Sequence, residues 1–503
     1  MVATDDAPYI HVVADHSAVR ATGMLRSSFG HRLAATTHGP DGVFAQWSFE
    51  DGRLLVETDR YGMYPLFVHI GKQEIFISPS VVKLLELGVP RDLDLDALCV
   101  FLHIGFFLRD ETPFRAIRAL PPAARVEWTR SSVSISGEPI FVRPQEIDRD
   151  DAVDAYIELF RQAIRRRQSH GRTVVPLSGG RDSRHILFEL VDAGRKPDVC
   201  VTAHYFPPRP DEDAIVAPRV AAAVGVRHVL LEQGDELDAE VSKNLATGFC
   251  TDEHAWFAVV AEFLSHGSDT VYDGIGGDVL SAGLFLTPDR LEKQSRGSYG
   301  ELAETFFKPR YARTLSKLLA REIRPALSPE RAKERLAAEL ATHAGAANPI
   351  GSFCFWNRTR REIALAPYAM GPASATVYAP YLDHELYDFL ASLPVEMLVD
   401  RSFHTDTVRR AFPEHADIGF ERKRLDHPDA RRHDRRIASA LIRSSRTGRD
   451  GTRTLLARRF ASQLRLATAI DRLRKEPARL QPRLALYLCQ LEAAAGNRLV
   501  ASL

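Results

Sequence analysis

The sequence predicts an α/β protein in which a β-rich N-terminal region precedes an open parallel sheet covered by helices. Two observations carry this prediction. Short apolar runs alternate with Gly, Asp and Pro over residues 8–135, which is typical of antiparallel strands. From residue 150 onward, helical and strand patterns alternate, as they do in proteins built on a parallel sheet. A chain of 503 residues has room for about two to four domains.

The elements follow from local patterns. In the N-terminal region we expect a helix over 94–107 and strands over 9–13, 43–47, 54–58, 66–70 and 74–78. A link near residues 143–146 precedes the second region. There we expect helices over 152–166 and 213–224, and strands over 174–177, 199–203, 228–231 and 270–273.

Two of these strands run directly into glycine-rich turns. The first turn reads Leu-Ser-Gly-Gly-Arg-Asp-Ser over 177–183, and the second reads Gly-Ile-Gly-Gly-Asp over 274–278. Ligands of open parallel sheets bind at the carboxyl ends of the strands. We therefore expect both turns to line one site.

The chemistry of the first turn suits a phosphate group. A strand, a tight turn and a helix aim backbone N–H groups and a helix N-terminus at an anion, and glycines let the backbone approach it. Ser178 and Ser183 add hydroxyl donors, and Asp182 offers a carboxylate for the Mg²⁺ that accompanies a polyphosphate.

Composition excludes several classes of protein. Lys plus Arg and Asp plus Glu are equal at 66 each, so net charge favours neither nucleic acid nor a membrane surface as partner. No apolar run is long enough to span a bilayer, and the N-terminus lacks the pattern of a signal peptide. The cysteines are scattered without a C-x-x-C pair, which predicts reduced thiols and a cytoplasmic protein (Cys99, Cys200, Cys250, Cys354 and Cys489).

The sequence motif S-G-G-x-D-S resembles the PP-loop of ATP pyrophosphatases, which cleave ATP between its α- and β-phosphates. No Lys follows the second Gly, so the turn is not a G-x-x-x-x-G-K-[ST] P-loop. The resemblance implies ATP and Mg²⁺ as cofactors, with AMP and pyrophosphate as products.

Taken in order, the motifs resemble those of the asparagine synthetase superfamily, nearer to its β-lactam synthetase and lasso-peptide cyclase branches than to asparagine synthetase itself. Residues 44–47 (Phe-Ala-Gln-Trp), 58–67 and 117–122 resemble its glutaminase domain, and 211–228, 274–278 and 377–385 resemble its synthetase domain. The resemblance implies a β-rich Ntn-hydrolase-like domain over 1–140, a PP-loop synthetase domain over 148–428, and a basic helical extension over 429–503.

Position 2 departs from that family. Its working glutaminases carry Cys there, whose thiol is the nucleophile, whereas this sequence has Val2. We therefore expect a degenerate glutaminase-like domain that hydrolyses no glutamine and packs on the synthetase half. A sequence start that misses the true N-terminus is the alternative.

The resemblance also assigns site residues. It implies nucleotide contacts by Leu177, Ser178, Gly179, Gly180, Asp182, Ser183, Thr202, Gly274, Ile275 and Gly276, with Asp182 and Asp278 as Mg²⁺ ligands. Lys423 is expected over the phosphates, where it stabilises charge as pyrophosphate leaves.

The base that activates the attacking amine is less well marked. Asparagine synthetases have Glu after the metal aspartate and β-lactam synthetases have Tyr between two glycines, but here these positions hold the apolar Val279 and Ile275. Glu362, at nearly the family's spacing before residue 380, is the candidate base. His254 and Tyr272 are secondary candidates for this base. Arg410 is expected to assist at the phosphates, although Asp406 stands where the family often has Lys. Asp383 is expected to have an architectural role.

The sequence thus predicts an AMP-forming amide synthetase that adenylates a carboxylate and passes it to an amine, in specialised biosynthesis such as macrolactam or β-lactam closure. Its substrate is a small molecule or peptide carrying both groups. An ammonia-dependent asparagine synthetase-like enzyme, a PP-loop enzyme that modifies RNA, and a non-catalytic binding protein are the alternatives. The segment after residue 428 is rich in Lys and Arg. It predicts a solvated helical face or a docking surface for a carrier or leader peptide, and a homodimer stays open.

Overall fold

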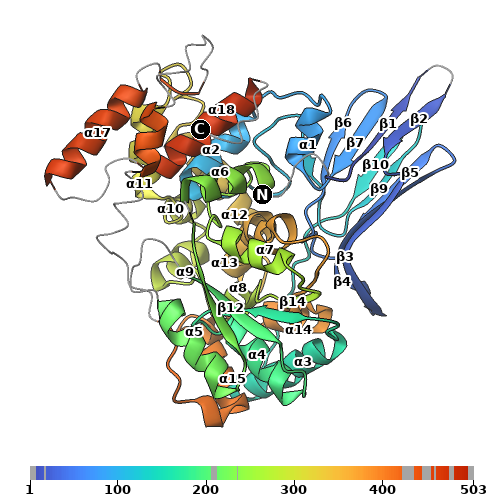
Figure 1. Cartoon of the computed structure of the whole chain (residues 1–503), viewed down its shortest axis with the longest axis vertical. Coiled ribbons are helices and arrows are strands. Elements are labelled where there is room, and N and C mark those ends of the chain that lie inside the picture. The colour runs from blue at the N-terminus through green and yellow to red at the C-terminus, as the bar shows by residue number, and fades with distance from the viewer. Residues whose placement is uncertain are drawn as a thin grey trace.

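The structure is a computed structural model. It describes residues 7–15, 18–204, 212–234, 236–421, 436–443, 455–457, 460–474 and 481–496. Figure 1 shows an N-terminal group of antiparallel strands on one side of the molecule, a parallel sheet among helices below it, and C-terminal helices on the opposite side at the top. The predicted fold class is confirmed, because a β-rich N-terminal region precedes a five-stranded parallel sheet.

The N-terminal region contains two five-stranded antiparallel sheets, ordered β2-β1-β7-β6-β8 and β10-β9-β5-β4-β3. Their buried residues alternate along the strands, as in β5, because successive side chains point to opposite faces. The strands are β1 Ile10–Ala14, β2 Val19–Gly23, β3 Arg26–Thr36, β4 Gly39–Glu50, β5 Arg53–Thr58, β6 Phe67–Ile70, β7 Glu74–Ser78, β8 Arg118–Ala119, β9 Arg125–Trp128 and β10 Val133–Ser136.

The parallel sheet has the strand order β13-β12-β11-β14-β15. Its strands are β11 Thr173–Pro176, β12 Val199–His204, β13 His228–Glu232, β14 Thr270–Tyr272 and β15 Thr376–Tyr378. β11 lies at the centre and pairs with β12 on one side and β14 on the other. The two glycine-rich turns follow β11 and β14, so they emerge side by side at the carboxyl edge of the sheet.

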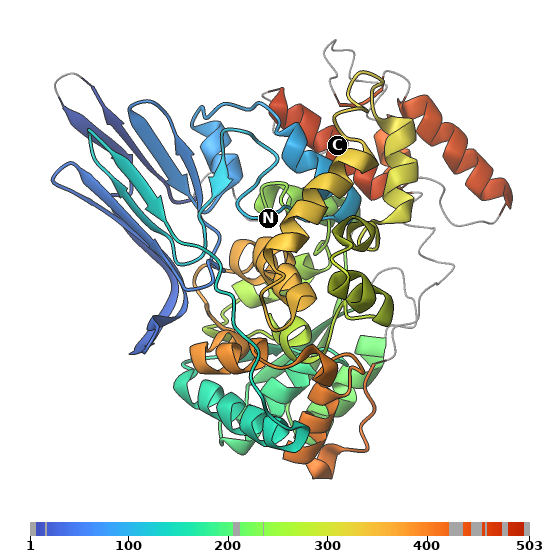
Figure 2. The ribbon, with the colours of Figure 1, turned by 180° about the vertical axis from the view of Figure 1, so that it is seen from behind.

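Helices cover both faces of this sheet. In Figure 1, α4 and α5 lie below it with α3, and α7 lies above it; Figure 2 shows α14 and α15 beside α3 from behind. The helices are α1 Val81–Glu86, α2 Leu95–Ile104, α3 Arg149–Arg166, α4 Asp182–Asp192, α5 Glu212–Ala223, α6 Glu236–Ala246, α7 Phe257–Ser265, α8 Gly277–Ser281, α9 Pro288–Ser295, α10 Tyr299–Glu304, α11 Pro309–Leu318, α12 Pro329–Thr342, α13 Pro349–Phe353, the π-helix η2 Cys354–Ile363, α14 His384–Ala391, α15 Phe403–Ala411, α17 Phe460–Arg474 and α18 Pro482–Ala495.

A buried ionic network joins the two regions. Arg167, at the end of α3, is 1% exposed and lies between Asp41 of β4 and Asp383, which are also buried. Arg360 and Arg361 of η2 donate to backbone carbonyls of residues 109, 111 and 120 in the N-terminal region. The N-terminal region is therefore packed against the synthetase half through charged as well as apolar contacts.

The C-terminal helix α18 belongs to a second apolar core. Leu484, Leu488 and Leu491 are buried in it, and Tyr487 stacks on Phe101 of α2 at 5.0 Å. The expectation of a solvated helical face is thus wrong for α18, because its leucines pack against the N-terminal region.

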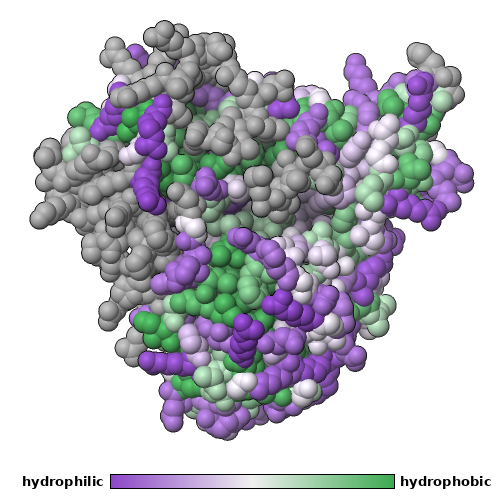
Figure 3. Space-filling view, viewed as in Figure 1, coloured by the Kyte–Doolittle hydropathy of each residue, from purple (hydrophilic) through white to green (hydrophobic). Residues whose placement is uncertain are grey.

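The surface shows one apolar concentration in the view of Figure 3, near the centre of the face that carries α7. Val259 and Phe263 of that helix are half-buried. Within the described residues, no helix combines the length and the apolar character needed to cross a membrane.

Candidate active site

The first glycine turn closes on itself through its own serines. The N–H of Ser178 donates to Oγ of Ser183 at 3.0 Å, and the N–H of Gly180 donates to Oγ of Ser178 at 3.2 Å. The N–H of Gly179 donates to a carboxylate oxygen of Asp213 on α5, 2.6 Å away. The N–H of Gly179 therefore already binds an anionic oxygen, and a phosphate would offer it an oxygen of the same kind.

Helix α4 starts immediately after this turn. Arg181, the residue before the helix, makes no capping hydrogen bond through its side chain, and Asp182 is the first residue of α4. The first N–H groups of a helix carry partial positive charge and need acceptors. This end of α4 is therefore suited to an anion placed beside the glycine turn.

The second glycine turn lies directly against Asp182. A Cβ atom placed on Gly277 would be only 2.6 Å from Cγ of Asp182, and one placed on Gly274 would be 2.9 Å from its Cβ. Glycine suits both positions because Asp182 occupies the space that a side chain would fill, with its carboxylate at Gly277 and its Cβ at Gly274. Asp278 follows Gly277 at the start of α8, so the structure brings the two predicted metal ligands to adjacent turns.

The remaining predicted nucleotide contacts lie around these turns. Leu177 is buried, and its carbonyl accepts a hydrogen bond from the hydroxyl of Thr202 at 2.6 Å. Ile275 is also buried, and its N–H donates to Asp273 at 2.8 Å. Burial, opposed by that hydrogen bond and reinforced by the charge of Asp182, raises the pKa of Asp273 to about 6. The site thus holds a third carboxylate that the sequence did not single out.

A segment near the end of α15 is fixed on the first turn. The N–H of Glu421 donates to the carbonyl of Gly179 at 3.0 Å, and the guanidinium of Arg184 binds the carbonyls of Gly179, Ile418 and Gly419. Lys423 itself lies outside the described residues.

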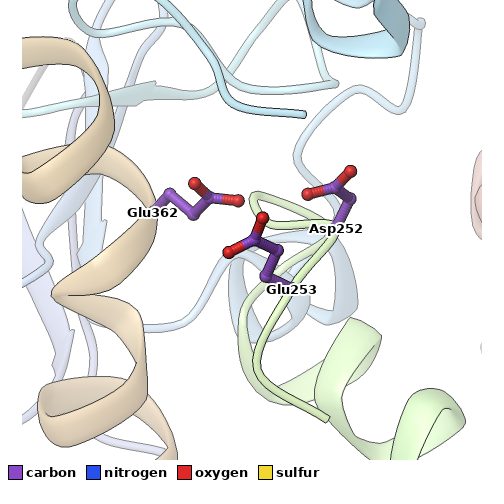
Figure 4. A group of neighbouring side chains, drawn as sticks. All are labelled: Asp252, Glu253 and Glu362. Carbon is purple, nitrogen blue, oxygen red and sulfur yellow. The ribbon is translucent and has the colours of Figure 1, made fainter. Parts of the chain in front are cut away.

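Glu362 lies in a group of charged side chains beyond the second turn. Its carboxylate oxygens and those of Asp252 and Glu253 lie within 4.8 Å of one another. Figure 4 shows the three carboxyl groups converging, with Glu362 on η2 and the other two on the segment between α6 and α7. Burial, followed by the charge of Glu253, raises the pKa of Glu362 well above its usual range.

Two cations balance much of this negative charge. Lys308 Nζ lies 2.8 Å from Asp252, and Arg358 contacts both Glu253 and Glu362 at 3.1 and 3.2 Å. Burial lowers the pKa of Arg358, but Glu362, Glu253 and Asp278 outweigh it and raise that pKa. The group is an ion network that joins η2 to the segment between α6 and α7, and a metal ion bound there would have to displace its cations.

Other predicted residues take different places. Arg410 pairs with Asp150 and Asp154 on the outer side of α3, at 3.0 and 2.6 Å. The expectation that it assists at the phosphates is therefore wrong, since it faces a neighbouring helix. Asp406 similarly binds Arg149.

Asp383 has an architectural position. It accepts hydrogen bonds at the start of α14 and pairs with Arg166 and Arg167. The hydroxyl of Tyr272 donates to the carbonyl of Arg167. His254 is buried, which lowers its pKa to about 4, and neither ring nitrogen has a hydrogen-bond partner among the described residues.

Sequence reasoning did not find Glu253, Lys308, Arg358 or His404. His404 of α15 is fully buried, with Nδ1 3.3 Å from a carboxylate oxygen of Asp182. These residues come from segments far apart in the chain, so no local spacing marks them.

The fold and the site together define an α/β protein with two glycine turns at adjacent strand ends and an antiparallel region beside the parallel sheet. The family model described as "Asparagine synthase" matches residues 155–433, and that described as "Glutamine amidotransferase domain" matches residues 25–137. Since the first match covers more than half of the chain, this protein belongs to the asparagine synthase family, whose members are ATP-dependent ligases that form amide bonds.

Solved structures show only distant likeness. One, titled "Structure of the allosteric regulatory enzyme of purine biosynthesis", is 10% identical, with 38% of this chain and 32% of that chain covered and a TM-score of 0.14. Another, glutamine phosphoribosylpyrophosphate amidotransferase from B. subtilis complexed with ADP and GMP, is 11% identical, with 48% and 44% covered and a TM-score of 0.14. The chain therefore spans less than half the length of each. No curated protein matches it.

Proposed function

We propose that this protein is an AMP-forming amide synthetase that adenylates a carboxylate and transfers the acyl group to an amine without hydrolysing glutamine. The observation that carries the proposal is the contact between Asp182 and the Gly277–Asp278 turn at the ends of neighbouring strands. This contact brings two carboxylates to the edge of an uncapped helix N-terminus. A nucleoside triphosphate with divalent cations needs that combination of anion donors and carboxylates.

The residues present fit Mg·ATP. The hydroxyls of Ser178 and Ser183 are donors for phosphate oxygens, and the N–H groups of residues 178–180 would join them by exchanging their present acceptors Ser183, Asp213 and Ser178 for the phosphate. Asp182 and Asp278 would hold Mg²⁺, which neutralises phosphate charge when bound. Lys423 follows Glu421 by two residues, and we assign it to the charge that builds up as pyrophosphate leaves.

The reaction proceeds in two displacements. A substrate carboxylate oxygen attacks the α-phosphorus of ATP, and the bond to the β-phosphate oxygen breaks to release pyrophosphate. The amine then attacks the acyl carbon, and AMP leaves with the electrons of the acyl–oxygen bond. We assign the proton lost by the amine to the carboxylate of Glu362, which Arg358 holds at 3.2 Å.

The nitrogen source is proposed to be an amine of the substrate. Val2 occupies the position where the family's glutaminases carry their nucleophilic Cys, and Cys99 is buried in α2, which supports an amine source other than glutamine. An amine carried by the substrate favours ring closure, as in macrolactam or β-lactam formation.

The test is release of AMP and pyrophosphate from Mg·ATP with aspartate plus ammonia, aspartate plus glutamine, and a crude metabolite extract in parallel. AMP formation with the extract but with neither defined mixture supports a specialised substrate. AMP formation with ammonia would instead indicate an asparagine synthetase-like enzyme. Formation of ADP rather than AMP in any mixture, or absence of Mg·ATP binding by calorimetry, would contradict the proposal.

A further inference from the structure

A buried polar network lies directly behind Asp182. Its centre is His404 of α15, whose Nδ1 lies 3.3 Å from Asp182 Oδ1 and 3.0 Å from Oγ of Ser281. Its Nε2 lies 3.3 Å from the hydroxyl of Tyr156 and 3.4 Å from that of Tyr381. His404 and Ser281 are fully buried, whereas the side chain of Asp182 is 23% exposed.

The partners decide which ring nitrogen carries the proton. A carboxylate oxygen accepts hydrogen bonds, so the 3.3 Å contact between Asp182 and Nδ1 is attractive when Nδ1 carries a proton. Ser281 already donates to the carbonyl of Gly277 at 2.8 Å, which leaves its lone pairs for the same Nδ1–H. The hydroxyl of Tyr156 donates to Oγ of Ser281 at 3.1 Å, and that of Tyr381 donates to the carbonyl of Asp182 at 3.3 Å, so both tyrosines beside Nε2 also contact the two halves of the site.

This geometry links the two halves of the site. Asp182 begins α4, while Ser281 lies on the short helix α8 three residues after Asp278. The next residue of α15, Thr405, accepts a hydrogen bond from the side chain of Arg181 at 2.6 Å. His404 and Thr405 therefore both contact the start of α4. Through His404, the orientation of one carboxylate is coupled to the helix that carries the other.

We propose that His404 is a positioning residue for Mg²⁺ binding: its Nδ1–H holds Asp182 in one orientation and fixes it relative to the helix of Asp278. The proposal rests on the proposed function, because it assigns Asp182 and Asp278 to the metal of Mg·ATP. A group that orients a metal ligand typically contributes about 10- to 100-fold to metal affinity. The effect therefore belongs to the metal-bound nucleotide and not to ATP alone.

The test compares the affinity for Mg·ATP with that for ATP in EDTA, measured by calorimetry on the full chain. Replacing His404→Phe keeps an aromatic ring but removes the donor. We expect Mg·ATP binding to weaken about 10- to 100-fold while metal-free ATP binding changes less than about twofold. The matched control is His185→Phe, because His185 is a buried neighbour at 5.6 Å between ring centres that makes no hydrogen bond to Asp182.

A second pair of variants separates positioning from folding. Replacing His404→Asn keeps an N–H near the Nδ1 position, whereas His404→Gln moves it toward the Nε2 end. We expect the Asn variant to bind Mg·ATP more tightly than the Gln variant, at similar melting temperatures. Equal Mg·ATP affinities for these two variants, or equal losses with and without metal in His404→Phe, would overturn the proposal. Absence of Mg·ATP binding by the unmodified protein would instead overturn the proposed function.

Discussion

Replacing Gly277→Ala tests the contact on which the site depends. The added methyl carbon would lie 2.6 Å from Cγ of Asp182, 2.8 Å from its Oδ1 and 2.9 Å from a ring carbon of Tyr381. Carbon atoms in contact normally lie about 3.5–4.0 Å apart, so the carboxylate must move away by about 1 Å. Gly277 does not require the left-handed backbone region, so the contact alone produces the effect.

Two magnitudes follow from this displacement. Extra volume in a packed site costs about 1–3 kcal/mol of stability. A shift of about 1 Å in a ligand to the reacting group costs on the order of 100-fold in function. We therefore expect Gly277→Ala to lower the melting temperature by a few degrees and to weaken Mg·ATP binding far more than that loss of stability explains.

Calorimetric titration with Mg·ATP and thermal unfolding of the same preparation give both quantities. The control is Gly345→Ala, because a Cβ at Gly345 meets nothing within 4 Å and the residue is not in the left-handed region. If Gly277→Ala binds Mg·ATP as tightly as the control does, Asp182 does not hold the metal and the reasoning is refuted.

Three other changes have defined outcomes. Replacing Arg167→Met removes the buried cation between Asp41 and Asp383 and should lower the free energy of unfolding by about 3–5 kcal/mol. This loss is measured as a lower midpoint of urea unfolding, and an unchanged midpoint would contradict the role of this network. Replacing Glu362→Gln should leave AMP-forming adenylation intact but slow amide formation at least about 100-fold, measured by mass spectrometry of the product, with exposed Glu330→Gln as control. Burial, then the charge of Arg167, lowers the pKa of His31 to about 3, so His31 stabilises the fold fully above pH 6.5 and loses this contribution as pH falls toward 3. Replacing His31→Phe should reduce the pH dependence of stability in that window by about 1.4 kcal/mol per pH unit, and an unchanged slope in acid unfolding would show that His31 is not buried in its neutral form.

The sequence could predict the elements whose residues follow a local pattern. The apolar run of β11 and the turn after it, with its two glycines, are read from residues 173–183, and β14 with its turn from residues 270–278. The meeting of the two turns also followed, because ligands of parallel sheets bind at one edge. β3 was missed because its residues are half-buried or exposed in alternation, so it shows no apolar run.

The charged surroundings of Glu362 could not be predicted in the same way. Arg358 and Glu362 are four residues apart on η2, but Asp252 and Lys308 lie on two other segments that only tertiary packing brings to them. His404 gave no signal either, since a single buried histidine on a helix has no characteristic spacing. Asp273 was passed over because a carboxylate at the end of a strand usually reads as a turn residue. The roles assigned to Lys423, Glu362 and the nucleotide contacts stay predictions.

The arginines of η2 make the synthetase half depend on the N-terminal region for its folding. Arg360 and Arg361 are almost completely buried and donate to main-chain carbonyls of the N-terminal region, so that region solvates two cations that water does not reach. Deleting it would leave both guanidinium groups, and the apolar face of α18, without a covering layer. The N-terminal region would consequently be retained by selection for folding even after any chemistry of its own had been lost, and a separately expressed synthetase half would require new residues at each of these contacts.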